Sequence, residues 1–298
     1  NAANEDKDIA HLQAMASGDY RLDDRFPGRL PELPVQVRSL KDRASGGDMR
    51  VDLALQGPRG FDILRAATDN RALIDELERK GRFEFVKGEI VPGLDVFIAR
   101  TGYTGEEMGV ELYVHPDDLK ALWDLLLAAG EPCGIAPAGL GARDSPRTEA
   151  GFPLYGHELA GPWDVDPMEA GYGSSVKFHK PFFVGREALL ERELNPRRRI
   201  VRFTVSGTTG RSLIRTGHPV VDGRGRYAGV VTSCCVVGDE QVGLALVERK
   251  MAKVGGKLNF FALPASARRI PPARRIDELA PGDAVLLAQE GRIVSRFR

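Results

Sequence analysis

Few of the side chains that commonly carry out chemistry stand at spacings that would let them act together. None of the five histidines has another histidine three or four residues away, as two metal ligands on one helix would. The three cysteines, Cys133, Cys234 and Cys235, form no Cys-x-x-Cys pair, so we expect neither a metal site nor a disulfide framework. The sequence also contains no Walker loop and no Gly-x-Gly-x-x-Gly, His-Glu-x-x-His or Gly-x-Ser-x-Gly motif, which argues against the enzyme classes that depend on them.

Two charged residues in glycine-rich segments remain as candidate binding groups. Glu111 belongs to the alternating stretch GVELYV, in which it faces away from the apolar side chains on either side of it. Arg143 belongs to the segment GLGARDS. Each also has an ordinary structural explanation: Glu111 as a solvated strand residue, and Arg143 as an ion-pair partner of Asp144 or Glu149 on a helix surface. The residues alone leave both interpretations open.

The elements that would position these two residues include both strands and helices. The apolar alternation of residues 51–56 predicts a strand, and Gly57 and Pro58 predict a turn that opens a helix. Further patterns predict helices over residues 8–15, 71–79, 116–130 and 186–193, and strands over residues 83–86, 95–100 and 110–114. Because regular crossovers are too few for a doubly wound sheet, we expect an α+β fold.

The composition changes at Asn195 and Pro196, where helical patterns largely stop. Beyond them, short apolar runs predict strands, with the plainest turn at Asp222 and Gly223 and the last run over residues 284–294. A chain of 298 residues has room for about two domains, or for three small ones. We therefore predict an α+β region at residues 1–195 and a small all-β domain at residues 196–298.

The overall composition limits the partners and the compartment. Lys and Arg number 42 and so do Asp and Glu, so the formal net charge is zero and no nucleic-acid partner is expected. No apolar run approaches the ~20 residues that a membrane span needs, and the polar start is not a signal peptide. The low cysteine content favours a reducing cytoplasm.

Four glycine-punctuated segments, taken in order, carry a resemblance. They are LALQGP at 53–58, RTGYTGEEMGVEL at 100–112, GLGARDSPRTEAGFPLYGHEL at 139–159, and PMEAG with KPFFVGREAL at 167–189. Together they resemble the aminomethyltransferase family, which comprises the T-protein of the glycine cleavage system and its folate-dependent relatives. The resemblance begins with NAANEDKDIAHL, runs through VGLALVE at 242–248, and extends more loosely to the C-terminus.

The resemblance implies both a fold and a reaction. Family members fold as a cloverleaf of three domains around a central folate channel, and the last domain is a β-barrel, which agrees with the boundary near residue 195. The T-protein takes an aminomethyl group from the lipoyl arm of a carrier protein, the H-protein, releases ammonia and forms methylenetetrahydrofolate. The resemblance therefore implies a transferase of one-carbon metabolism with tetrahydrofolate as its cofactor.

The resemblance also implies site residues. In the family, the glutamate of the Gly-x-Glu segment and the arginine of Ala-Arg-Asp-Ser bind folate, and these positions are Glu111 and Arg143 here. A fixed carboxylate can accept hydrogen bonds from the N–H groups of a pterin edge, and an arginine fork suits carbonyl or carboxylate groups. Tyr103, in the turn before Glu111, would stack on the ring or border it. Tyr155 and Trp163 are weaker candidates.

One departure from the family pattern concerns Arg143. The family's Ala-Arg-Asp-Ser is usually followed by leucine, whereas Pro146 follows here. Proline inside a helix removes a backbone donor and costs ~3 kcal/mol unless it lies in the first turn. The setting of Arg143 is therefore expected to differ.

A second departure concerns the catalytic group. In the family, an aspartate in an Asp-Asp-Leu-like segment upstream of Asn-Ala-x-Asn is the main catalytic residue. This chain begins at Asn1, and the pair Asp23 and Asp24 lies on the wrong side of that segment. We therefore expect an N-terminal segment to be missing, and we assign no catalytic residue.

Two alternatives to an aminomethyltransferase stay open. A folate-dependent demethylase of the same fold would differ in its donor-side residues, which vary most. A folate-binding module without transfer activity would resemble the family's iron–sulfur assembly relatives, which carry a Lys-Gly-Cys motif. No cysteine of this chain is preceded by Lys-Gly, which lowers that second alternative without removing it.

Overall fold

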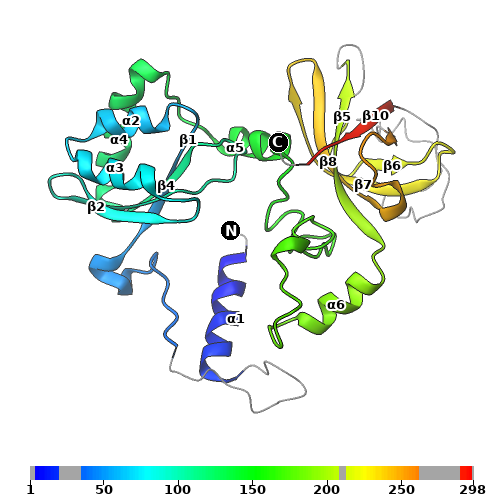
Figure 1. Ribbon diagram of the computed structural model, residues 1–298, viewed down its shortest axis with the longest axis horizontal. Coiled ribbons are helices and arrows are strands. Elements are labelled where there is room, and N and C mark those ends of the chain that lie inside the picture. Colours follow the sequence, from blue (N-terminus) through cyan, green and yellow to red (C-terminus); the bar gives the residue numbers. More distant parts are fainter. Residues whose placement is uncertain (1–3, 20–34, 208–212, 262–288, 297–298) are drawn as a thin grey trace. The chain divides into compact units, whose positions relative to one another are not determined.

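The chain divides into two compact units. The structure, a computed structural model, describes residues 4–19, 35–207, 213–261 and 289–296 (Figure 1). One unit comprises Glu5–Gly139 and is called the sheet unit below. The other comprises Asn1–Asn4 with Leu140–Arg298 and is called the barrel unit. Each unit is described by itself.

The sheet unit is built on one antiparallel sheet of four strands in the order β1-β4-β3-β2. The strands are β1 (Val51–Gln56), β2 (Phe85–Val91), β3 (Leu94–Ala99) and β4 (Gly109–Val114). β4 therefore lies inside the sheet, hydrogen-bonded to β1 on one side and to β3 on the other. One face packs against the helices α2 (Gly60–Ala67), α3 (Arg71–Arg79) and α4 (Leu119–Gly130) (Figure 1).

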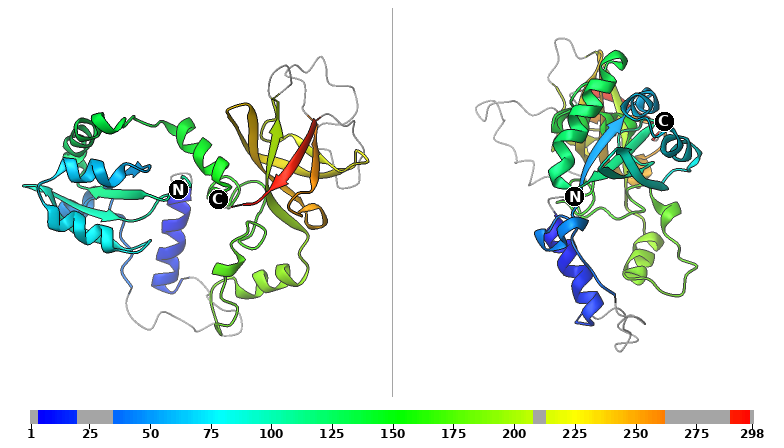
Figure 2. Two further views of the ribbon diagram at one scale, coloured as in Figure 1. Left: turned by 45° about the horizontal axis from the view of Figure 1, so that its top comes forward. Right: turned by 90° about the vertical axis from the view of Figure 1, so that its left-hand side faces the viewer.

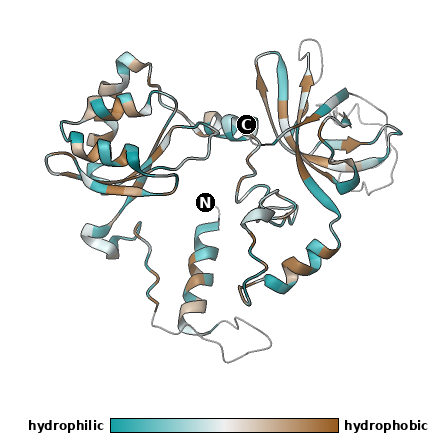
Figure 3. Ribbon diagram, viewed as in Figure 1, coloured by the Kyte–Doolittle hydropathy of each residue, from teal (hydrophilic) through white to brown (hydrophobic). Residues whose placement is uncertain are grey.

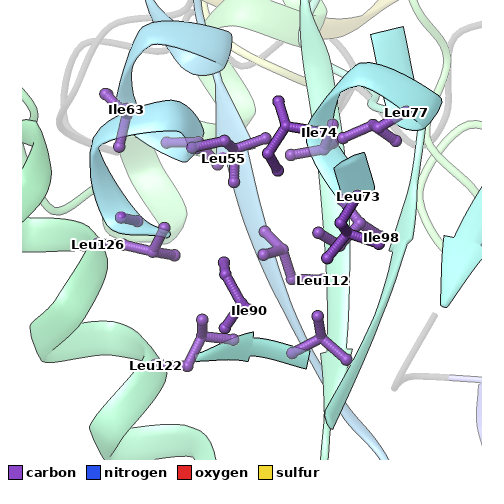
Figure 4. Packing of buried hydrophobic residues seen from close by; sticks show 14 of the residues in the cluster. Leu55, Ile63, Leu73, Ile74, Leu77, Ile90, Ile98, Leu112, Leu122 and Leu126 are labelled. Carbon is purple, nitrogen blue, oxygen red and sulfur yellow. The ribbon is translucent and has the colours of Figure 1, made fainter. Parts of the chain in front are cut away.

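The alternation of side chains along the strands decides which face these helices cover. Figure 4 shows Leu55 of β1, Ile98 of β3 and Leu112 of β4 in one apolar cluster with Ile74 of α3 and Leu126 of α4. Burying a side chain of this size contributes about 1.5 to 3 kcal/mol. The buried apolar residues of the strands are thereby held on the helix side, and the residues that alternate with them lie on the opposite face.

The described part of the sheet unit also contains α1 (Glu5–Ser17) and the short 3-10 segments η2 (Arg43–Asp48), η3 (Pro116–Asp118) and η4 (Glu131–Cys133). α1 confirms and extends the helix predicted over residues 8–15. None of its residues is buried, and Figure 3 shows its first turn in hydrophilic colours, where the acidic residues Glu5, Asp6 and Asp8 lie. The packed core of the sheet unit is therefore made without α1.

The barrel unit contains a closed barrel of six strands in the order β10-β5-β8-β7-β6-β9 (Figure 2). The strands are β5 (Arg198–Ser206), β6 (Pro219–Val221), β7 (Tyr227–Val237), β8 (Glu240–Glu248), β9 (Lys257–Phe260) and β10 (Gln289–Val294). Its interior is filled by side chains such as Phe203 and Phe260, whose ring centroids lie 4.3 Å apart. The predictions of an α+β fold and of a C-terminal β-barrel are confirmed.

Ahead of the barrel strands, the barrel unit contains α5 (Leu140–Ala150), η5 (Gly173–Ser175) and α6 (Arg186–Leu194), and η6 (Arg249–Met251) follows β8. α6 confirms the helix predicted over residues 186–193. α5 carries Arg143, and Pro146 lies inside this helix rather than in its first turn.

One local prediction differs from the structure, and another is confirmed. The strand predicted from residue 83 begins at Phe85, because Phe83 has a φ of 70° and its N–H group donates to the carbonyl of Arg100 at 2.8 Å. The turn predicted at Asp222 and Gly223 is confirmed, and Gly225 adopts a left-handed conformation in it, with a φ of 76°. Glycine adopts such a conformation without the steric cost that a Cβ brings.

Some predictions fall outside the described residues, namely those on Asp23, Asp24 and residues 284–288. Over the ranges that the structure does describe, no helix is both long enough and apolar enough to cross a membrane. The same ranges hold no cluster of three or more His, Cys, Asp or Glu side chains that could bind a metal ion.

Candidate functional site

Glu111 stands on the face of the sheet that α2, α3 and α4 do not cover. It lies on the interior strand β4, directly between Ala54 of β1 and Ala99 of β3. Its side chain is half-buried, and the hydroxyl group of Tyr113 donates a hydrogen bond of 3.1 Å to Glu111 Oε2. Because both cross-strand neighbours end in a methyl group, the carboxylate is the only acidic group in its row of the sheet.

Tyr113 is a site residue that the sequence reasoning missed. Burial, together with the nearby carboxylates of Glu111 and Asp52, raises the pKa of its phenol to about 12. The phenol therefore stays protonated at ordinary pH and remains a hydrogen-bond donor to Glu111. Since Tyr113 lies two residues after Glu111 on one strand, the period-two alternation was a signal that could have identified it.

Tyr103 lies in the connection between β3 and β4, which covers residues 100–108. Its side chain is 37% exposed. The far end of this connection is fastened to the end of β1, because the N–H group of Gly57 donates to the carbonyl of Met108 at 3.0 Å. Tyr103 and Glu111 thus belong to one continuous segment of the sheet unit.

Arg143 lies in the barrel unit, near the start of α5. Its side chain is exposed, and no hydrogen bond or ion pair is formed by it within the described residues. Asp144 pairs instead with Arg147, to whose Nε it accepts a hydrogen bond of 2.7 Å. The interpretation of Arg143 as a partner of Asp144 or Glu149 is therefore not supported by the contacts.

A buried ion pair lies after Arg143 in the segment of residues 139–159. The Arg147 side chain is 3% exposed and donates to Glu158 Oε2 at 3.1 Å, while the Glu158 side chain is fully buried. The same oxygen accepts from the backbone N–H group of Leu154 at 2.9 Å, and the other carboxylate oxygen accepts from the hydroxyl group of Ser233 on β7. This network fastens α5 and the chain after it to the barrel, so we assign Arg147 and Glu158 a structural role.

Two weaker candidates from the sequence also lie in the barrel unit. Tyr155 is partly exposed. Trp163 meets the ring of His157 edge-on, with centroids 5.1 Å apart, and packs against buried residues of the barrel. Trp163 is therefore a packing residue in this structure.

The barrel unit also contains a cavity of about 600 Å³ beside α6. Several of the charged residues that line it pair with one another: Arg192 with Asp164 at 2.6 Å, and Arg198 with Glu169 at 2.8 Å. None of Glu111, Tyr103 and Arg143 lines this cavity. The cavity is therefore separate from the residues that the sequence nominates.

Comparison with protein families gives one match that covers more than half of the chain. The family described as the GCVT N-terminal domain matches residues 1–180. This range includes Tyr103, Glu111 and Arg143. It also contains the glycine-punctuated segments at 53–58, 100–112 and 139–159, as well as PMEAG at 167–171.

Similar proteins are known both from sequence and from structure. The chain is 39% identical over 261 residues to an aminomethyltransferase from Moorella thermoacetica, covering 87% of this chain and 62% of that protein. It is 44% identical over 212 residues to an aminomethyltransferase from Streptomyces avermitilis, covering 67% of this chain and 54% of that protein. A crystal structure of glycine cleavage system aminomethyltransferase T from Bartonella henselae aligns with a TM-score of 0.59 at 28% identity, covering 83% of this chain and 59% of that one. The chain thus spans about three fifths of the length of such relatives.

Proposed function

Because the chain belongs to the GCVT N-terminal domain family, we propose that it acts as an aminomethyltransferase. In this proposal it transfers a one-carbon unit from an aminomethyl-lipoyl carrier protein to tetrahydrofolate, with release of ammonia. The observation that carries the proposal is the placement of Glu111: a half-buried carboxylate in the middle of a sheet, held by Tyr113 and flanked by alanines.

This arrangement suits the edge of a pterin ring. Ala54 and Ala99 leave a shallow surface on each side of Glu111, over which a flat ring can lie. Tyr113 occupies one acceptor position of Oε2, so the other carboxylate oxygen and the remaining lone pairs can accept from an amine and a ring N–H group. When bound, tetrahydrofolate supplies the nitrogen atoms that receive the one-carbon unit.

Two further residues have roles in this proposal. Arg143 has no partner among the described residues, so its guanidinium group is free to bind a carbonyl or carboxylate group of the folate. Tyr103 is exposed enough to border the ring. The acidic residue that would act in the chemical step stays unassigned.

The carrier and the compartment also belong to the proposal. An aminomethyl group on a lipoyl arm reaches tetrahydrofolate only if the carrier, an H-protein, docks close to the folate site. All three cysteines are free thiols, which supports a reducing compartment such as the cytoplasm.

The proposal is tested by calorimetric titration of tetrahydrofolate into the wild-type chain, Glu111→Gln and Glu107→Ala. Replacing the charged acceptor with an amide should weaken binding about 10- to 150-fold, the effect of losing ~1.5 to 3 kcal/mol of charged hydrogen bonding. Glu107 is an exposed glutamate in the same connection, and its variant should bind like the wild type. Equal affinities for wild type and Glu111→Gln would remove Glu111 from the site, and a wild type that binds no tetrahydrofolate would overturn the proposed function.

A second measurement addresses the transfer itself. The chain, preceded by a segment that carries the family's Asp-Asp-Leu-like motif, is mixed with tetrahydrofolate and an aminomethyl-loaded lipoyl carrier, and ammonia release is followed with and without each component. Ammonia release that needs both the folate and the carrier is expected. Release that needs neither would contradict the assignment.

A further inference from the structure

Gln56 stands at the end of β1 on the same face of the sheet as Glu111. Its backbone pairs with Gly109, two pairs beyond that of Ala54 with Glu111. The pairing of β3 with β4 ends at Ala99 and Glu111, so the connection from β3 leaves the sheet beside Gln56. The side chain of Gln56 therefore lies where the connection departs and where it returns.

One amide group holds both ends of this connection. Gln56 Nε2 donates to the carbonyl oxygens of Thr101 and Val110, each at 3.2 Å. Gln56 Oε1 accepts from the hydroxyl group of Thr104 at 3.1 Å. Thr101 and Thr104 belong to the departing part of the connection, whereas Val110 belongs to β4.

Two glycines make room for this amide. A Cβ atom added to Gly102 would lie 2.7 Å from Gln56 Cδ, and one added to Gly109 would lie 2.8 Å from the same atom. Real Cβ atoms essentially never come closer than 3.0 Å to another heavy atom. Any other residue at either position would push the amide away from its three hydrogen-bond partners.

The backbone conformation gives no other reason for these two glycines. Gly105, in the same connection, has a φ of 88°, a region that favours glycine. Neither Gly102 nor Gly109 has a positive φ. The space taken by Gln56 is thus the structural requirement that glycine meets at residues 102 and 109.

We propose that Gln56 is a positioning residue of the candidate site, which fixes Tyr103 and Glu111 in place by clamping the connection between β3 and β4. The inference rests on the proposed function, because the residues that Gln56 holds are those proposed to bind folate. Gln56 itself need not touch the folate. Its effect is to keep the binding groups in one arrangement, so that ordering them does not have to accompany binding.

The first experiment measures tetrahydrofolate affinity and thermal stability for Gln56→Met, which keeps the side-chain length but removes the amide. Binding should weaken about tenfold, in line with the loss of three neutral hydrogen bonds that order a loop. Gly88→Ala is the control, because its Cβ would meet only the flexible end of Leu73 on the other side of the sheet, and its affinity should equal that of the wild type. Unchanged affinity in Gln56→Met would overturn the inference.

A double-mutant cycle tests the clamp itself. Gly102→Ala should weaken folate binding about tenfold in the wild-type background, because it displaces the amide, and less than about twofold in a Gln56→Ala background, where no amide remains to displace. A merely structural role for Gly102 would give the same factor in both backgrounds. Equal factors would contradict the inference.

A third readout needs no folate. Trypsin can cut after Arg100, at the start of the connection, whenever that connection opens. Gln56→Met should be cut there about tenfold faster than the wild type, while the rate for Gly88→Ala stays unchanged. Equal rates for Gln56→Met and wild type would overturn the clamp even if folate binds, whereas a faster rate in a chain that binds no folate would leave the clamp standing and count only against the proposed function.

Discussion

Arg147 donates a hydrogen bond of 3.1 Å to Glu158, and neither side chain has more than 3% of its surface exposed. Each charge is stabilised by further contacts, Arg147 by Asp144 and the carbonyl of Phe152, and Glu158 by the hydroxyl group of Ser233. A buried pair of this kind adds little to stability compared with an apolar pair of the same shape, but removing one partner leaves an uncompensated charge in the interior.

Arg147→Met should lower the free energy of unfolding by about 3 to 5 kcal/mol, because Glu158 would remain buried without its cation. Urea denaturation followed by circular dichroism measures the change. Arg143→Met is a matched control on the same helix, and because Arg143 is exposed and pairs with none of the residues that the structure describes, it should change stability by less than about 0.5 kcal/mol. Similar losses for both variants would show that the buried pair is not the cause.

Arg143→Met should leave the fold intact and, if Arg143 binds folate as proposed above, weaken tetrahydrofolate binding about 10- to 150-fold, because a charged hydrogen-bond donor is lost. Calorimetric titration measures the affinity. Arg249→Met, which removes another exposed arginine of the barrel unit, should bind like the wild type. Equal affinities for the two variants would exclude Arg143 from the site.

Tyr113 should make stability fall in alkaline solution. Its pKa rises from 10.0 to about 12 on folding, so the folded chain holds the phenolic proton more tightly than the unfolded chain does. The contribution of this phenol to the free energy of unfolding is constant below about pH 10 and falls as the pH rises from about 10 to about 12. Tyr113→Phe should show a smaller loss over that interval in urea denaturation, and an identical loss would contradict the raised pKa.

Pro146→Ala should raise the free energy of unfolding by about 1 to 3 kcal/mol, because proline inside α5 cannot donate to the carbonyl four residues earlier and its ring crowds that turn. Thermal and urea denaturation measure the gain. Pro116→Ala offers a control, since Pro116 lies in the first turn of η3, where proline is well tolerated. No gain at Pro146 would mean that α5 accommodates the ring without loss of stability.

The elements most open to prediction were those whose signals are local. α3 spans the predicted residues 71–79 because Asn70 caps its first turn and three buried apolar residues follow at helical spacing. β4 was equally plain, since its alternation of apolar and polar residues is complete. The face on which Glu111 lies follows directly from that alternation.

The contacts that build the site were beyond prediction because they join residues far apart in the chain. Gln56 bonds to groups 45 and 54 residues later, and Ser233 bonds to Glu158 across 75 residues. The sequence marked LALQGP and RTGYTGEEMGVEL as separate glycine-rich segments. Gln56 of the first segment occupies the space left by Gly102 and Gly109 of the second. This fit depends on the register of β1 with β4, which no local pattern specifies.

The register of β4 limits how the connection before it can change. Ala99 is paired with Glu111 at one end, and Gln56 fits over Gly109 at the other. Because successive strand residues face opposite sides, sliding β4 by a single residue along β1 and β3 would turn the carboxylate into the apolar core. An insertion or deletion must therefore be taken up within residues 100–108, and it preserves the clamp only if Thr101 and Thr104 still reach Gln56.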